Sequence, residues 1–242
     1  MRSLNKLKSV AGLTSFQLFM LTYIALAISK WQYAPIRYTH GLRAEFWAEG
    51  GTKYFSCAHY TKSLECFLQT DAGYLAFLPR TLSLTIEFLE IPLIHWPLAQ
   101  QISVIVIMLA CLSCVSLKAF EPFLGSAFSR FLLAVVMGWY LEYDLHSFSN
   151  LSYFLIIPAS LMLAYLIVEP KIKWPLAFGV GLFVSLAILS KGILVGLVPM
   201  VALVVVFNLW TMRWPIALGL LVPVIASSAL QISTLLASRT QM

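Results

Sequence analysis

Long apolar stretches without a charged side chain are the feature that most restricts how this chain can fold. The stretch from Ile102 to Leu117 and the one from Ile193 to Leu209 contain no Asp, Glu, Lys or Arg. An apolar stretch of about 17 to 25 residues can cross the hydrocarbon core of a bilayer as an α-helix. We therefore expect an all-α protein, a polytopic membrane helix bundle.

Counting these stretches predicts about seven spans. They lie near Leu13 to Ser29, Ile102 to Leu117, Phe128 to Leu141, Ser152 to Val168, Trp174 to Leu189, Ile193 to Leu209 and Ile216 to Leu236. The composition agrees, because apolar residues make up 60% of the chain and charged residues 11%, whereas a soluble domain carries about 25% charged residues. The break from Ser190 to Gly192 leaves open whether it separates two spans or is a kink within one hairpin.

The distribution of Lys and Arg predicts the orientation, since short loops rich in these residues stay on the cytoplasmic side. With a cytoplasmic N-terminus, the following basic residues lie inside: Arg2, Lys6, Lys8, Lys118, Arg130, Lys171, Lys173 and Arg213. Only Lys191 and Arg239 fall in short outer segments. The net charge of +6 is scattered among apolar segments. It therefore fits membrane orientation, and we expect no nucleic acid as a partner.

This topology divides the chain into three parts. Residues 1–30 are the N-terminal cytoplasmic tail and first span, 31–101 form a large external loop, and 102–242 form a hydrophobic helix bundle. Most carboxylates then lie outside: Glu45, Glu49, Glu65, Asp71, Glu87, Glu90, Glu142 and Asp144. The end of the loop is apolar and broken by prolines, so we expect short interfacial helices there, with Arg80, Glu87 and Glu90 turned to water.

The segment Glu45-Phe-Trp-Ala-Glu49-Gly-Gly-Thr-Lys-Tyr places two acids and two glycines in this external loop. Acids beside a bilayer are costly to desolvate and mark a functional site by default. Glu49 is the candidate general base, and the alternative is an exposed loop acid that caps a helix. Glu45, four residues earlier, is a candidate helper acid or ligand for a divalent metal, or else part of a solvated face.

Three patches of the sequence resemble GT-C-type membrane glycosyltransferases. The segment from Phe46 to Phe55, followed by Gly73-Tyr74-Leu75 and Pro79-Arg80, is similar to their first external loop. The segment from Phe148 to Phe154 is similar to the Asn-containing outer turn that opens a later span, and the third patch runs from Leu189 to Pro199. Members usually carry a second acid after the first, at the position that Gly50 occupies here.

The resemblance implies transfer of a sugar from a polyprenyl-phosphate carrier to an acceptor glycan or lipid, on the outer face of the bacterial inner membrane. This chemistry needs a carboxylate that takes up the acceptor proton and cations that offset the charge of the departing phosphate. Arg80, Lys53 and Lys191 are the candidates for binding that phosphate. The alternatives are ordinary contact with lipid headgroups and, for Lys191, a basic residue in a hairpin turn.

Further substrate-binding candidates are Tyr74 in the first patch and a polar cluster of Asp144, His146 and Asn150 at the outer mouth of the bundle. For this cluster a solvated turn is the alternative. Two other classes of function stay open. One is a non-catalytic GT-C-like scaffold, and the other is a transporter or a flippase-associated membrane subunit.

The four cysteines form two pairs with different expectations. Cys57 and Cys66 lie in the external loop, where an oxidising periplasm permits either a disulfide or two free thiols. Cys111 and Cys114 fall inside the second span. There we expect them to act as small apolar packing residues.

Overall fold

The computed structural model describes residues 13–31, 50–61, 65–71, 73–140, 148–169 and 171–239. Four helical segments in this part of the chain are long and apolar enough to cross a membrane: Leu93–Ser116, Leu151–Val168, Gly192–Trp210 and Trp214–Ala237. A fifth is added if Lys118–Leu124 and Ala127–Trp139, which meet at a bend of 87°, form one span. The protein is therefore a helical membrane protein with four or five candidate spanning helices by length and composition.

The predicted apolar windows all fall on helices. These helices are α2 (Ser15–Trp31), α6 (Trp96–Ser113), α8 (Ala127–Tyr140), α9 (Ile156–Val168), α10 (Trp174–Ser190), α11 (Val198–Trp210) and α12 (Trp214–Arg239). α2 and α10 are apolar but shorter than the four long segments. α10 ends at Ser190, Lys191 is extended, and the 3₁₀ segment η8 (Gly192–Leu197) leads into α11. The break after Ser190 therefore separates two helices.

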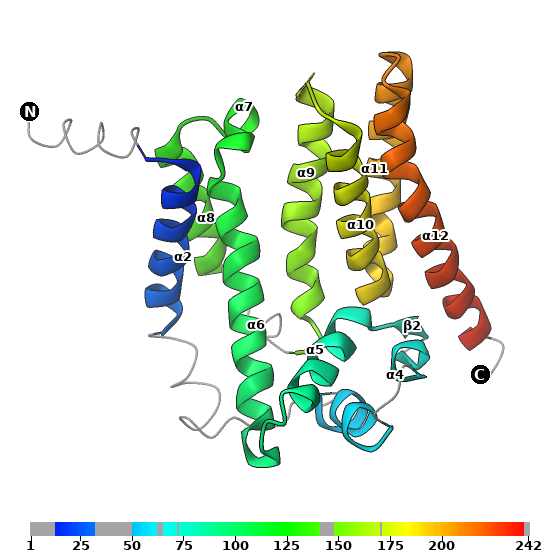
Figure 1. Cartoon of the computed structure of the whole chain (residues 1–242). Coiled ribbons are helices and arrows are strands. Elements are labelled where there is room, and N and C mark those ends of the chain that lie inside the picture. Colours follow the sequence, from blue (N-terminus) through cyan, green and yellow to red (C-terminus); the bar gives the residue numbers. More distant parts are fainter. Residues whose placement is uncertain are drawn as a thin grey trace, which may run out of the picture.

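The long helices form two neighbouring groups (Figure 1). α2, α6 and α8 pack together, and α9, α10, α11 and α12 form the second group. α6 also contacts α9 and the 3₁₀ segment η7 (Leu151–Leu155) that precedes it. One hydrophobic core cluster runs through both groups and includes Leu26, Leu112, Leu163 and Leu220. The groups are thus joined through α6.

Close packing of α10 against α12 depends on Gly181. A Cβ atom built on Gly181 would lie 2.7 Å from Cγ of Pro223 and 3.0 Å from the carbonyl oxygen of Leu220. Small residues at such crossings let the backbones of two membrane helices approach each other. Gly181 therefore fixes α12 beside α10 along the middle of the bundle.

The described residues between 50 and 95 form a compact unit at one end of the bundle, which we call the end unit. Its elements are the π-helical turns η1 (Gly50–Phe55) and η2 (Cys57–Thr61), α4 (Glu65–Leu68), β1 (Thr70–Asp71), β2 (Tyr74–Leu75), α5 (Phe77–Phe88) and η3 (Leu93–His95). Figure 1 shows α4, β2 and α5 at the end of the bundle where α10 and α12 finish. α5 contacts α10, and β2 contacts both α10 and α12.

Two buried polar side chains attach the end unit to the bundle. The Gln231 side chain of α12 is fully buried. Its Oε1 accepts the backbone N–H of Leu75 at 3.1 Å, and its Nε2 lies 3.4 Å from the Leu75 carbonyl oxygen. Ser190 Oγ at the end of α10 accepts the N–H of Leu78 at 3.1 Å. Buried backbone groups need such partners, so these contacts fix where β2 and the start of α5 lie.

The expectation that Arg80 is turned to water is wrong. Arg80 is 1% exposed, because η1, η2 and α4 cover the face of α5 that carries it. Glu87 is half-buried and lies 3.1 Å from Nδ1 of His59, whereas Glu90 is exposed as expected. α5 therefore has one covered and one open face, and it does not lie alone on the membrane surface.

Candidate functional site

Lys191 is held at the junction between α10 and α11, beside the turn that opens α9. Its ammonium group donates to the backbone oxygen of Ser149 at 3.2 Å and to Oδ1 of Asn150 at 3.1 Å. The side chain is half-buried. Lys191 is a predicted phosphate ligand, and Asn150 is a predicted substrate ligand. The two residues are thus in direct contact.

Two tyrosine rings flank the same ammonium group. Nζ of Lys191 lies 5.3 Å from the ring centre of Tyr74 and 5.1 Å from that of Tyr153. Rings at this distance attract a cation through their negative faces, worth about 0.5 to 2 kcal/mol each. We call Lys191, Ser149, Asn150, Tyr74 and Tyr153 the lysine cluster. It is a cation set between two aromatic side chains.

Gly192 lets Tyr74 approach the lysine. A Cβ atom on Gly192 would lie 3.1 Å from Cβ of Tyr74, which is closer than most side chains tolerate. The next residue of β2 is Leu75, and the Gln231 side chain contacts both its backbone N–H and its carbonyl oxygen. Tyr74 is therefore positioned from two directions, by the glycine after Lys191 and by the anchored strand.

A second cluster surrounds the carboxylate of Asp71, which is 2% exposed. Oδ1 of Asp71 accepts a hydrogen bond from Nζ of Lys53, and Oδ2 accepts one from the Tyr54 hydroxyl at 2.6 Å. Burial, followed by the hydrogen bond and negative charge of Asp71, raises the pKa of Tyr54 above its ordinary value. Tyr54 therefore stays protonated and keeps donating to Asp71.

Arg80 completes this group, the aspartate cluster of Lys53, Tyr54, Asp71 and Arg80. Its guanidinium carbon lies 5.6 Å from the ring centre of Tyr54. Burial lowers the pKa of Arg80, and the negative charge of Asp71 offsets part of that effect. Among the described residues, Nε of Arg80 is buried without a hydrogen-bond partner. One carboxylate thus faces two cations, and one of these cations retains a buried donor.

The lysine and aspartate clusters adjoin each other. Asp71 lies opposite Tyr74 in the antiparallel pair β1–β2, and Gly73 between them has a φ of 83°, which favours glycine. The Tyr54 ring packs edge-to-face on Phe148, with ring centres 5.8 Å apart. Phe148 directly precedes Ser149 of the lysine cluster. The end unit and the turn before α9 therefore build one continuous site.

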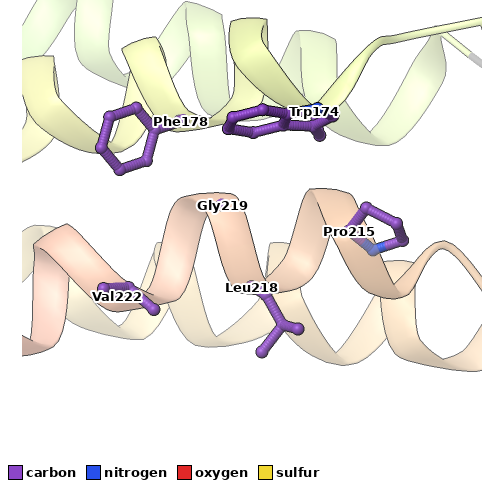
Figure 2. Close-up of a pocket in the computed structure, with 6 residues that line it drawn as sticks. All are labelled: Trp174, Phe178, Pro215, Leu218, Gly219 and Val222. Carbon is purple, nitrogen blue, oxygen red and sulfur yellow. The ribbon is translucent and has the colours of Figure 1, made fainter.

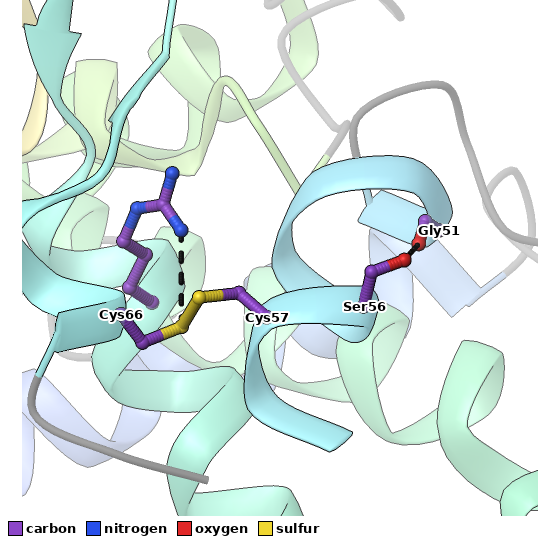
Figure 3. Close-up of a disulfide and its surroundings, with 5 residues drawn as sticks. Gly51, Ser56, Cys57 and Cys66 are labelled. Carbon is purple, nitrogen blue, oxygen red and sulfur yellow. Dashed lines mark hydrogen bonds between the residues drawn. A yellow bond between two sulfur atoms is a disulfide. The ribbon is translucent and has the colours of Figure 1, made fainter. Parts of the chain in front are cut away.

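A disulfide joins Cys57 and Cys66 within the end unit (Figure 3). It joins η2 to α4, and Nη1 of Arg80 lies 3.8 Å from Sγ of Cys66. The sequence left a disulfide and two free thiols open, and the structure contains the disulfide. The bridge ties together the two elements that shield Arg80 from water.

The predicted site residues fall into three sets. Lys191, Asn150 and Tyr74 meet in the lysine cluster, and Lys53 and Arg80 belong to the aspartate cluster. The remaining predicted residues lie outside the described part of the chain: Glu45, Glu49, Asp144 and His146. Glu49 directly precedes the first residue of η1 in the sequence.

Sequence reasoning missed Asp71 as the organising acid of the site. It also passed over Tyr54 and Tyr153 as ring partners of the two cations. A signal was available for Asp71, because it lies two residues before the Gly73-Tyr74 pair that the family resemblance includes. Tyr153 lies inside the patch from Phe148 to Phe154, but its contact with Lys191 depends on how η7 packs beside the end of α10.

The described residues contain no group of three or more His, Cys, Asp or Glu side chains that could hold a metal ion. Cations and aromatic rings make up most of both clusters, and Asp71 is the carboxylate of the second one. This arrangement is suited to binding an anionic group and to orienting a polar one next to a ring.

No family model, curated protein or solved structure matches this chain. The fold and the site therefore define the class of protein by themselves. It is a helical membrane protein with a cationic, aromatic site where the end unit meets the bundle.

Proposed function

We propose that this protein is a GT-C-type membrane glycosyltransferase. It would move a sugar from a polyprenyl-phosphate carrier to an acceptor glycan or lipid on the outer face of a bacterial inner membrane. Support comes from the lysine cluster at the end of the bundle, combined with the family resemblance of the three patches that supply Tyr74, Asn150 and Lys191.

The proposal includes seven crossings and a cytoplasmic N-terminus. α10 has 17 residues, which rise about 26 Å, and it packs along α12 and α9. α2 packs along α6 and α8 in the same manner. Counting both short helices as spans would put the end unit outside and the short basic segments, which include Lys118, Lys171 and Lys173, inside, as the positive-inside rule requires.

One observation carries the functional proposal, namely the setting of Lys191. Its ammonium is oriented by two neutral oxygens, from Ser149 and Asn150, and flanked by two rings. A cation that is oriented before the ligand arrives needs little reorganisation to stabilise a developing negative charge. A carrier whose isoprenoid tail lies in the bilayer would present its phosphate at this level of the protein.

The reaction follows from these roles. The acceptor hydroxyl oxygen forms a bond to the anomeric carbon of the sugar while its proton moves to a carboxylate. The bond between the anomeric carbon and the phosphate oxygen breaks, and its electron pair leaves with the phosphate, which Lys191 and Arg80 stabilise. Displacement in one step inverts the configuration at the anomeric carbon.

Glu49 is the proposed general base, with Glu45 as its helper. Asp71 is unsuited to that role, because Lys53 and Tyr54 occupy both of its carboxylate oxygens. Asp71 instead orients the side chains around Arg80. Glu49 directly precedes η1 in the sequence, four positions before Lys53.

Activity assays on the purified full chain test the proposal. A panel of polyprenyl-phosphate sugars would be offered with a mixed glycan and lipid acceptor pool, and sugar transfer followed by mass spectrometry. Glu49→Gln keeps the shape of the side chain but cannot take up a proton, so turnover should fall about 10²- to 10⁴-fold. Glu65→Gln, an exposed acid of α4, is the matched control and should retain parental turnover.

Undecaprenyl phosphate without a sugar provides a separate binding measurement. The parent and Glu49→Gln should bind it equally, since the base does not contact the carrier. If Glu45→Gln loses turnover while Glu49→Gln keeps it, the general base is Glu45, four residues earlier in the sequence. Full turnover in both variants, or no transfer by the parent, would replace the enzyme proposal with the non-catalytic scaffold.

A further inference from the structure

An apolar groove lies between α10 and α12 (Figure 2). It lies near the starts of both helices, which Figure 1 places at the end of the bundle opposite the end unit. Its volume is about 430 Å³, and its lining comes from Trp174, Phe178, Pro215, Leu218, Gly219 and Val222. Figure 2 shows Trp174 and Phe178 along one helix and Gly219 on the helix opposite. The groove is independent of the proposed glycosyltransferase site.

Gly219 forms the floor of the groove. A Cβ atom there would lie 3.3 Å from the backbone oxygen of Trp174 and 3.3 Å from the backbone nitrogen of Phe178. The helices therefore approach closely at this point, while larger side chains stand on both sides. Leu218 and Val222 are 54% and 61% exposed, and on membrane helices such exposed apolar side chains face lipid chains.

Basic residues precede both helices that form the groove. Lys171 and Lys173 precede α10, Arg213 precedes α12, and both lysines are exposed. Nη2 of Arg213 donates to the backbone oxygen of Glu169 at 2.7 Å, and its Nε is buried without a partner in the described chain. Glu169 uses Oε1 to accept the backbone N–H of Lys171 at 3.1 Å. Three cations and one carboxylate thus lie in the short segments that lead into α10 and α12, where the apolar lining begins with Trp174 and Pro215.

We propose that this groove binds one anionic phospholipid, with an acyl chain along Phe178, Leu218 and Val222 and its phosphate at Lys171, Lys173 and Arg213. Basic pockets between membrane helices bind the headgroups of anionic lipids. Trp174 lies at the boundary between the two parts, where tryptophan prefers the headgroup level. The change from apolar lining to basic mouth along one groove matches the two ends of such a lipid.

Native mass spectrometry of the full chain in a neutral detergent tests this assignment. Dioleoyl phosphatidylglycerol and dioleoyl phosphatidylcholine would be supplied in equal amounts. We expect one tightly retained phosphatidylglycerol, bound at least about fivefold more than phosphatidylcholine. In the Lys171→Gln/Lys173→Gln double variant this preference should fall at least about fivefold. Lys118→Gln removes an exposed lysine elsewhere at the same end of the bundle and should leave it unchanged.

Val222→Trp places a large side chain at the exposed edge of the groove and should fill it. The amount of phosphatidylglycerol that this variant retains should therefore be lower than for the parent. Phe178→Ala removes one wall and should lower retention too, so the test holds even where the larger side chain impairs folding. Equal binding of the two lipids by the parent, an equal loss in Lys118→Gln, or full retention in both groove variants would overturn the proposal. So would a dimer of the parent that Val222→Trp dissociates, because the groove would then hold a second copy of the chain.

Discussion

The ammonium group of Lys191 lies 3.1 Å from the side-chain oxygen of Asn150, although 41 positions separate the two residues in the chain. Lys191 follows α10, and Asn150 precedes the 3₁₀ turn that opens α9. The contact brings one end of each helix together under the end unit. It also joins two of the three patches on which the proposed function rests.

Replacing Lys191 by Gln should weaken binding of undecaprenyl phosphate about 10- to 150-fold. A hydrogen bond to a charged group is worth about 1.5 to 3 kcal/mol, which corresponds to that range. Helix content in detergent should change little, whereas loss of the two ring contacts, about 0.5 to 2 kcal/mol each, should lower the free energy of unfolding by about 1 to 4 kcal/mol. Affinity measured by titration for the parent, Lys191→Gln and the control Lys118→Gln checks this. Equal affinity in all three would remove Lys191 from the phosphate site.

Replacing Gln231 by Leu should lower the free energy of unfolding by about 1 to 3 kcal/mol. The buried N–H and carbonyl of Leu75 would then lose the partner that α12 provides. Thermal unfolding followed by tryptophan fluorescence measures the change. Ser233→Ala, at an exposed position of the same helix, should stay within about 0.5 kcal/mol of the parent. A Gln231→Leu variant as stable as the parent would mean that β2 is not anchored by this contact.

Counting the free thiols of the denatured protein by alkylation should reveal the disulfide. Without reductant, Cys111 and Cys114 should each take up one label, and after reduction all four cysteines should do so. Protein isolated from an oxidising compartment is needed, and intact mass reports the number of labels. Four labels before reduction would contradict the pairing.

The double variant Cys57→Ser/Cys66→Ser should lose up to about 3 kcal/mol of stability, as expected for a short closed loop.

Tyr54 should make stability depend on pH in the alkaline range. Its pKa is raised in the folded protein, first by burial and then by Asp71. The unfolded chain therefore releases the Tyr54 proton near pH 10 while the folded chain keeps it, so stability is full below pH 10 and decreases above it. The stability advantage of the parent over Tyr54→Phe should shrink by about 1.4 kcal/mol per pH unit above that point. Unfolding free energies of both proteins at pH 8 and pH 11 test this, and a constant difference would contradict it.

Single-cysteine labelling should report the proposed topology. In a background in which all four natural cysteines are replaced, a cysteine at Glu65 should react with an impermeant reagent added to intact cells after outer-membrane permeabilisation. A cysteine at Lys171 should react only after the inner membrane is broken. Both positions are exposed, at opposite ends of the bundle, so access to the reagent decides the result. The reverse pattern would place the end unit in the cytoplasm and overturn the site.

Membrane class and helix positions could be predicted from the sequence. Runs such as Ile193 to Leu209 are apolar over a whole span, and this is a local property of the chain that neighbouring segments do not alter. Tyr74, Asn150 and Lys191 could each be named as candidates from short contiguous patches, and their place in a functional site stays a prediction. The disulfide was one of two outcomes that the positions of Cys57 and Cys66 allowed.

Tertiary structure alone decided which of the candidate residues contact each other and which side chains are buried. The charge of Arg80 predicted a side chain exposed to water. The side chain is buried instead, because η1, η2 and α4 fold over α5. The anchoring of Leu75 joins residues 156 positions apart, a separation at which no local pattern carries information. Asp71 became the centre of a cluster only because β1 and β2 turn it toward Lys53 and Tyr54. Hydrophobic spans are determined residue by residue, whereas a polar site is determined by which distant backbones the packed helices bring together.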